Sequence, residues 1–216
     1  MSGTPETTRV AAASPFDADA AAALSVWSAG GEEQLADFSG LDLRGADLSG
    51  LDLADSVLSE AVLSQVPLRG ADLFRAELTA ADLSGADLTG AWLTKATLDE
   101  ATLRGTILRE ANLGSASLWG VDARGADLRG ASLANAALLR TDLSGADLSD
   151  VSVDRTSFKV VLDERTVLTG LSGTVYGPAG VRDATDGDPR ELSSTALEQW
   201  LNARGANVRV LAPGEN

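Results

Sequence analysis

The residues with the greatest chemical potential in this sequence are aspartates that recur in a regular spacing. When their residue numbers are taken modulo 20, eight of them fall into two sets, Asp42, Asp82, Asp122 and Asp142 in one and Asp47, Asp87, Asp127 and Asp147 in the other. Two carboxyl groups about 5 Å apart can act as acid and nucleophile in glycoside hydrolysis. Carboxylates that stay ionised in rows can instead bind a basic partner surface.

Two of the side chains that enzymes use most often in catalysis are absent. The chain has 216 residues with no histidine and no cysteine, which excludes a Ser-His-Asp triad, thiol chemistry and a zinc site of ordinary ligand type. No phosphate-binding loop or nucleophile elbow is present, and the small repeated residues described below favour a filled core over a substrate pocket. We therefore expect no cofactor, no metal and no catalysis.

The net charge limits the partners. At −15, the chain lacks the basic stripe of a nucleic-acid-binding protein and is unsuited to an anionic membrane surface. No segment approaches the ~20 apolar residues of a membrane span. The N-terminal residues lack the pattern of a signal peptide, and the absence of cysteine fits a reducing compartment. We expect a cytoplasmic protein that binds neither nucleic acid nor membranes directly.

A five-residue repeat decides the fold. From Phe38 to Phe158, every fifth position holds an apolar residue: 21 of the 25 are Leu, and the others are two Phe, Ala123 and Val153. Two residues earlier the chain has Ala in 16 of the 25 cases. A period of five gives no stripe on a helix and alternates faces on a straight strand. Both positions can face one interior only if the chain turns a corner in every repeat.

Four such corners close a square coil of 20 residues, and stacked coils pair about 4.8 Å apart, like neighbouring strands. The sequence therefore predicts an all-β fold, a right-handed parallel β-helix of about six coils with small helical caps at both ends. The glycines that follow many repeats, such as Gly45 and Gly125, suit the corners because glycine tolerates unusual backbone angles.

The pattern resembles the pentapeptide-repeat family, whose members form a right-handed quadrilateral β-helix. The resemblance covers residues 36–160, where copies such as those at 81–90 and 126–130 are close to the family consensus. Some members protect DNA gyrase from quinolones by imitating duplex DNA. The resemblance therefore implies a non-catalytic, DNA-mimicking modulator of a type II topoisomerase that confers resistance to gyrase poisons.

The charge of the repeats tests this implication. Residues 36–160 contain 19 acidic and 11 basic residues, a net charge of −8. Duplex DNA of similar length, about 30 Å, carries about 18 charges. Aspartate at this repeat position also commonly hydrogen-bonds its own turn, so a purely structural role for the eight aspartates is the competing interpretation.

Outward apolar residues support a second hypothesis, a general protein–protein interaction scaffold. Phe74 and Trp92 fall on one wall in successive coils, and Trp119 and Leu139 fall on another. Exposed aromatic patches mark contact sites, and these could receive an external protein or the C-terminal part of this chain.

We expect four segments. Residues 1–35 form a tail and a capping helix that begins with Ser14 as N-cap and ends near Gly30, and residues 36–170 form the solenoid. Residues 171–192 form a linker that is flexible from Gly177 to Pro189. Residues 193–216 form a helix and strand, with a capping box from Thr195 to Glu198. That helix has an apolar face, Leu197, Trp200 and Leu201, which must pack on the rod or form a homodimer.

Overall fold

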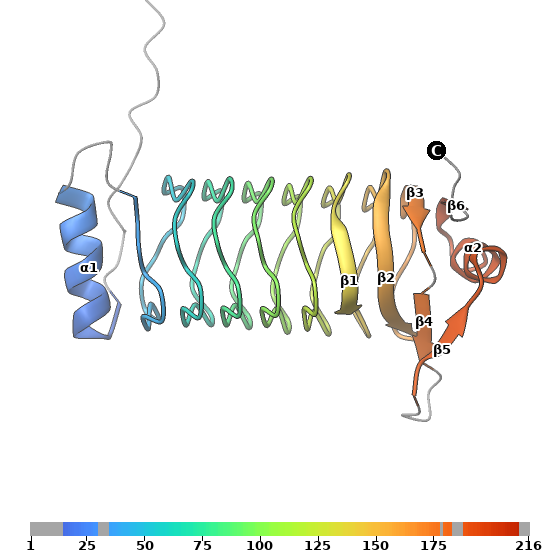
Figure 1. The fold of residues 1–216 in the computed structure, drawn as a ribbon, viewed down its shortest axis with the longest axis horizontal. Helices are drawn as coiled ribbons and strands as arrows, with labels where there is room; N and C mark the ends of the chain where they lie inside the picture. The colour runs from blue at the N-terminus through green and yellow to red at the C-terminus, as the bar shows by residue number, and fades with distance from the viewer. Residues whose placement is uncertain (1–14, 30–34, 178, 183–187, 212–216) are drawn as a thin grey trace, which may run out of the picture.

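The computed structural model describes residues 15–29, 35–177, 179–182 and 188–211. Figure 1 shows a straight rod of stacked coils, with helix α1 (Ala18–Ala29) at one end and helix α2 (Ser194–Asn202) at the other. No helix in the described part of the chain is long and apolar enough to span a membrane.

Successive coils follow one another at a constant interval in the sequence, which confirms the predicted β-helix. Parallel bridges join residues 20 apart along the rod, from Asp37 with Val57 to Ser152 with Ser172. The hydrogen bonds between coils are short, for example 2.9 Å from the Leu43 N–H to the Val62 carbonyl. Each coil therefore serves as a strand layer for the next.

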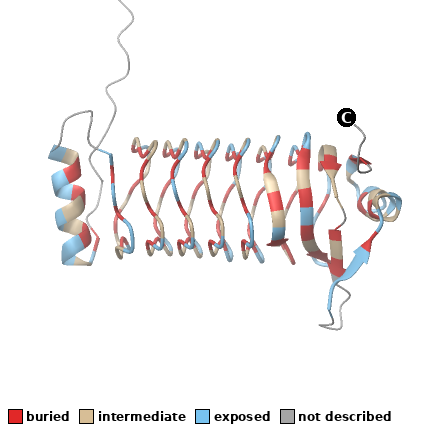
Figure 2. Cartoon of the chain, viewed as in Figure 1, coloured by how far each residue is buried: buried red, intermediate tan, exposed pale blue. Residues whose placement is uncertain are grey.

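The interior is built as the repeat predicted. Every side chain at the leucine positions is buried, and at the positions two residues earlier only Leu41 is partly exposed. Figure 2 shows that buried residues recur in every coil along the rod, alternating with more exposed ones. Because leucine and alanine alternate with outward residues in every wall, these side chains pack together inside the bore.

The corners have one shared backbone conformation. From Gly40 to Arg155, the third residue of every corner turn has a positive φ. An example is Gly45, with φ of 86°, in the turn closed by the Ala46 N–H and the Leu43 carbonyl at 3.1 Å. Thirteen non-glycine residues in the described chain adopt the same positive φ, among them Arg75 at 57°. An L-residue costs about 1 kcal/mol in this conformation, so the stacking of the coils imposes the corner even where glycine is missing.

The last complete coil departs from this plan. Strand β1 (Ala137–Asp142) pairs with β2 (Thr156–Asp163), and the register shifts between Leu139 and Thr141. The coil that contains β2 is one residue short at its first corner, because Thr141 pairs with Val160, only 19 residues later. A turn from Asp163 to Thr166 adds the residue back, and Asp147 again pairs with a residue 20 later, Val167. The sequence showed only that the repeat falters after Val160.

The Asp163 side chain organises this turn. It is 7% exposed. Its carboxylate accepts hydrogen bonds from the N–H groups of Gly145 (2.8 Å), Thr166 (3.0 Å) and Arg165 (3.1 Å), and from the Thr166 hydroxyl (3.0 Å). In a regular coil the Gly145 N–H would donate to a backbone carbonyl of the next coil. Asp163 replaces that carbonyl where the backbone has left the repeat.

The expected linker over residues 171–192 differs from the structure, which has β3 (Ser172–Tyr176), β4 (Ala179–Arg182) and β5 (Arg190–Leu192) in this range. The sheet runs β5-β4-β2-β3-β6, with β4 antiparallel to β5. Ala179, Val181 and Leu192 are buried, and this burial favours strands where glycine and proline suggested a loop. Residues 178 and 183–187 of the segment expected to be flexible lie outside the described chain.

The C-terminal unit consists of α2 and β6 (Asn207–Leu211), which pairs parallel to β3 and continues the stack. Helix α2 has Ser193 as its N-cap, with the Ser193 hydroxyl accepting from the Ala196 N–H. The expected capping box from Thr195 to Glu198 does not form. Its glutamate binds β6 instead.

Helix α1 covers the first coil. Its buried side chains are Ala20, Leu24 and Trp27, and the Trp27 ring meets Phe38 edge-on with centroids 5.7 Å apart. Asp17 accepts from the N–H groups of Asp19 and Ala20 at the start of the helix. Ser14 and Gly30 lie outside the described residues.

Candidate protein-binding surface

The rod has four flat walls. We number them by the first outward residue of each in the first coil: wall 1 from Asp37, wall 2 from Asp42, wall 3 from Asp47 and wall 4 from Asp52. Each wall continues in the corresponding repeat of every later coil, and each repeat adds three outward residues to it. The two sets of predicted aspartates lie on walls 2 and 3.

These aspartates fold back on their own turns. Asp82, for example, accepts from the Ser84 N–H at 3.0 Å, and Asp147 accepts from the Ser149 N–H at 3.0 Å. Aspartates on the other walls do the same, as Asp52 does with the Ala54 N–H at 3.1 Å. The local role that competes with partner binding is therefore present on every wall.

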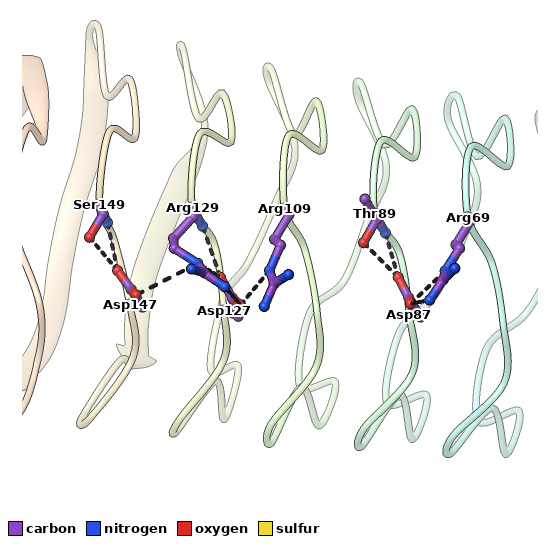
Figure 3. Close-up of polar contacts among 8 residues, drawn as sticks. All are labelled: Arg69, Asp87, Thr89, Arg109, Asp127, Arg129, Asp147 and Ser149. Carbon is purple, nitrogen blue, oxygen red and sulfur yellow. Dashed lines mark hydrogen bonds and ion pairs between the residues drawn. The ribbon is translucent and has the colours of Figure 1, made fainter.

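Arginines form ion pairs with aspartates on walls 2 and 3. The six arginines of these walls each lie within 2.8 Å of an aspartate oxygen; they are Arg44, Arg69, Arg104, Arg109, Arg124 and Arg129. Figure 3 shows the column on wall 3, where Asp127 lies between Arg129 of its own repeat and Arg109 of the preceding coil. Because arginine and aspartate alternate along the column, its surface is a row of ion pairs rather than a row of bare carboxylates.

The arginines keep these carboxylates ionised. The guanidinium of Arg124, which donates to Asp122, lowers the pKa of that carboxyl to about 2 against the effect of burial. Arg129 and Arg109 do the same for Asp127, whose pKa is also about 2. Both groups have pKa values below their ordinary value of 3.8.

These shifts predict acid sensitivity. Because the folded pKa is lower than the unfolded one, each carboxylate stabilises the fold above pH ~4, and this stabilisation is lost as the pH falls towards 2. Asp122 and Asp127 contribute at most about 2 kcal/mol each, reduced by solvent screening. We expect the urea midpoint of unfolding, followed by circular dichroism, to fall between pH 4 and pH 2.

The matched control is the double variant Asp122→Asn and Asp127→Asn. It should be less stable at neutral pH and should lose less stability between pH 4 and pH 2. An equal loss in both proteins would show that these two carboxyls do not cause the acid sensitivity.

The net charge is not concentrated on walls 2 and 3. Within residues 36–160, walls 1 and 3 each have a net charge of −3, and walls 2 and 4 each have −1. Walls 2 and 3 together thus carry −4, the same as walls 1 and 4. Counting the aspartates alone suggested two acidic walls, and the arginines beside them remove the difference.

Walls 4 and 1 carry the outward aromatic residues. Trp92 is 62% exposed and Trp119 is 38% exposed, whereas Phe74 and Leu139 are half-buried. On wall 4, the backbone of Trp92 pairs with that of Asp72 in the preceding coil. On wall 1, the backbone N–H of Trp119 donates to the Asp99 carboxylate at 2.9 Å. We call the part of walls 4 and 1 that holds Phe74, Trp92, Trp119 and Leu139 the aromatic side.

Cations without an acidic partner gather on the aromatic side. Of the 11 basic residues in 36–160, eight form ion pairs, and among the described residues Lys95, Arg140 and Lys159 have none. The Lys95 amine lies 5.7 Å from the Phe74 ring, and the Arg140 guanidinium lies 5.7 Å from the Trp119 ring. Lys159 follows Leu139 in the next coil. This side therefore offers apolar rings beside cations that are free to bind a carboxylate.

The C-terminal helix does not cover the aromatic side. Leu197 and Leu201 are fully buried between α2 and the end of the rod, and Trp200 packs partly against the same core under the Arg204 guanidinium, 3.9 Å from its ring. In this arrangement the apolar face of α2 is used within one chain and is not available to a second copy.

One shallow hollow of about 370 Å³ lies where β2 meets β4 and β5, lined by Lys159, Val160, Val161, Gly180, Pro189 and Glu191. Among the described residues that line it, the ionisable groups are one lysine and one glutamate. No group of three potential metal ligands occurs within the described residues.

The fold and surface define a class of protein, a square β-solenoid with filled bore and flat, rigid walls. A family model of pentapeptide repeats matches residues 36–73, 71–110 and 111–150. The chain belongs to the pentapeptide-repeat family. Proteins of this family are in general structural or binding proteins rather than enzymes.

Several solved structures are similar to the chain. HetL, a pentapeptide-repeat protein involved in heterocyst differentiation regulation in the cyanobacterium Nostoc sp. strain PCC 7120, is 32% identical over 67% of this chain and 75% of its own, with a TM-score of 0.52. Rfr23 from the cyanobacterium Cyanothece 51142 is 37% identical over 42% of this chain and 62% of its own, with a TM-score of 0.41.

QnrB1, a plasmid-mediated fluoroquinolone resistance protein, is 19% identical over 65% of this chain and 75% of its own, with a TM-score of 0.46. With TM-scores below 0.5, the likenesses to Rfr23 and QnrB1 say nothing about function. No curated protein sequence matches the chain.

Proposed function

We propose that this protein is a non-catalytic binding protein that holds another protein against its aromatic side. The observation that carries the proposal is Trp92, which is 62% exposed on a wall that the coils hold rigid. A large aromatic ring fixed in water has a high free-energy gain on burial and little side-chain entropy to lose, and tryptophan dominates many interface hot spots.

The cations define the chemistry of the partner. Lys95 and Arg140 lie over aromatic rings on this side and form no ion pair with a described residue. A partner segment with carboxylates beside apolar side chains would satisfy both groups at once. On walls 2 and 3 the arginines are already bound to aspartates, so a charged partner there would have to displace existing ion pairs.

The double variant Trp92→Ala and Trp119→Ala tests this proposal. Immobilised wild-type protein is used to capture partners from an extract of the source cells, and bound proteins are identified by mass spectrometry. We expect the variant to lose at least about tenfold of the specific partner, as for the removal of a hot-spot residue worth more than 1.4 kcal/mol. The circular dichroism spectrum should not change, because both rings project outward.

Arg109→Ala on wall 3 is the matched control, since it removes a large exposed side chain from the opposite side of the rod. Retention of the same partner by the tryptophan variant would rule out the aromatic side as the binding surface. Loss of the partner in both variants would indicate a surface that extends over the charged walls.

A second candidate is the DNA-mimicking modulator of a type II topoisomerase. The observation in its favour is that carboxylates such as Asp122 and Asp127 are fixed in regular columns and stay ionised. The net charge of −8 over residues 36–160 is less than half of the about 18 charges of duplex DNA of that length.

A supercoiling assay with DNA gyrase, with and without a quinolone, separates the two candidates. Inhibition or protection at micromolar protein, unchanged by Trp92→Ala and Trp119→Ala, would favour the DNA mimic. The absence of both effects would exclude it.

A further inference from the structure

Strand β6 is the last layer of the stack and has one edge turned away from the coils. The Asn207 N–H donates to the Leu171 carbonyl at 2.7 Å, so this residue faces β3. Successive residues of a strand direct their N–H and C=O groups to opposite sides. Val208 and Val210 therefore direct these groups away from β3. Such an edge can pair with a strand of another molecule.

Two side chains of α2 fill this edge. The Asn202 amide accepts from the Val208 N–H at 3.0 Å and donates to the Val208 carbonyl at 3.0 Å. The Glu198 carboxylate accepts from the Val210 N–H at 2.8 Å. The side-chain amide of asparagine has the same donor and acceptor as a peptide group, so Asn202 makes the pair of bonds that a residue of an added strand would make.

The spacing of the two elements explains why one helix can do this. Glu198 and Asn202 are four residues apart on α2, a rise of about 6 Å. Val208 and Val210 are two residues apart on β6, about 6.6 Å. The neighbouring residues Leu197 and Leu201 are fully buried and hold the helix in place beside the strand.

We propose that Glu198 and Asn202 occupy the edge of β6 at which a strand from a second copy of this chain would pair. By occupying it, they prevent the rod from continuing into a second chain. A second copy is the natural occupant because its strands have the coil geometry that the stack continues. The apolar bore also reaches this end, where Val208 and Val210 are 4% and 7% exposed. Opening the edge therefore exposes both backbone groups and apolar surface.

The experiment combines hydrogen exchange with sedimentation. In the wild-type protein the amides of Val208 and Val210 should exchange at least about tenfold more slowly than unbonded amides, as for a hydrogen bond worth about 1.4 kcal/mol. The double variant Glu198→Ala and Asn202→Ala should lose this protection. Its weight-average mass should rise with concentration towards twice that of the wild type, as for a symmetric pair formed through this edge.

Two further variants keep the test specific. Gln199→Ala changes an exposed residue of the same helix and should behave like the wild type. Adding Val210→Pro to the double variant removes the outward N–H and should reverse the association, because proline cannot donate to a strand. Fast exchange of both amides in the wild type would overturn the proposal whether or not any variant folds. A double variant with the wild-type mass at all concentrations would also overturn it.

Discussion

Replacing Asp163 by alanine is expected to lower the free energy of unfolding by about 3 kcal/mol, as for the loss of a buried, multiply hydrogen-bonded carboxylate. The substitution leaves the N–H groups of Gly145 and Thr166 without their acceptors. It also removes the ion pair with Arg165, at 2.9 Å. The turn from Asp163 to Thr166, which restores the 20-residue period, would lose the side chain that holds it. The loss of structure should therefore concentrate in the last coil and the C-terminal unit.

Asp52→Ala is the matched control. Asp52 accepts one hydrogen bond from the Ala54 N–H, so its loss should cost less than about 1 kcal/mol. Urea unfolding followed by circular dichroism measures both values at neutral pH. Equal costs for the two substitutions would mean that Asp163 is only another turn aspartate.

Replacing Leu103 by alanine is expected to cost roughly 4 kcal/mol, towards the upper part of the range for buried leucines. Leu103 is fully buried and lies one coil from Ala123, the residue in this column that is smaller than leucine. Truncation at 103 would create two adjacent small residues in one column. Their combined space is larger than that of a single truncation, and the cost of a cavity rises with its volume.

Leu98→Ala supplies the comparison, because Leu98 lies between Leu78 and Leu118 in its own column and all three are buried. It should cost about 1 kcal/mol less than Leu103→Ala, since about 24 cal/mol are lost for each Å³ of cavity. The same unfolding measurement checks both variants. A smaller cost at position 103 would show that the column has already closed around Ala123.

The sequence determined the solenoid because its repeat leaves one geometric solution. Leucine every fifth residue, with alanine two residues earlier, can face one interior only in a square coil, and the bridges between residues 20 apart confirm that coil. Positions where the repeat ends were harder. Val181 and Leu192 lie among glycine, proline and charged residues, which are typical of a loop. They lie in strands because the last coil offers an open edge with which β4 can pair.

The sequence predicted which residues of the candidate surface face outward, but not which side chains they pair with. The repeat register correctly indicated that Trp92 and Trp119 point outward. It also placed the aspartates on walls 2 and 3. It did not predict their ion pairs, because these depend on whether an arginine side chain extends to the next coil, as that of Arg109 does to Asp127. The role of Glu198 was missed because the capping-box pattern assigned its carboxylate to the start of the helix. The expected strand gave no sign that its Val210 N–H, 12 residues further on, would bind this carboxylate.

The hydrogen bonds between coils run along the axis of the rod, and α1 and β6 lie at its opposite ends (Figure 1). A force that pulls these ends apart would load the bonds of one layer at a time instead of shearing many together. The rod would then unzip coil by coil. Each step would release 20 residues, an extension of about 65 Å for a stretched chain after the coil's own height is subtracted. The solenoid is therefore weak to tension along its length, because its coils can separate one after another.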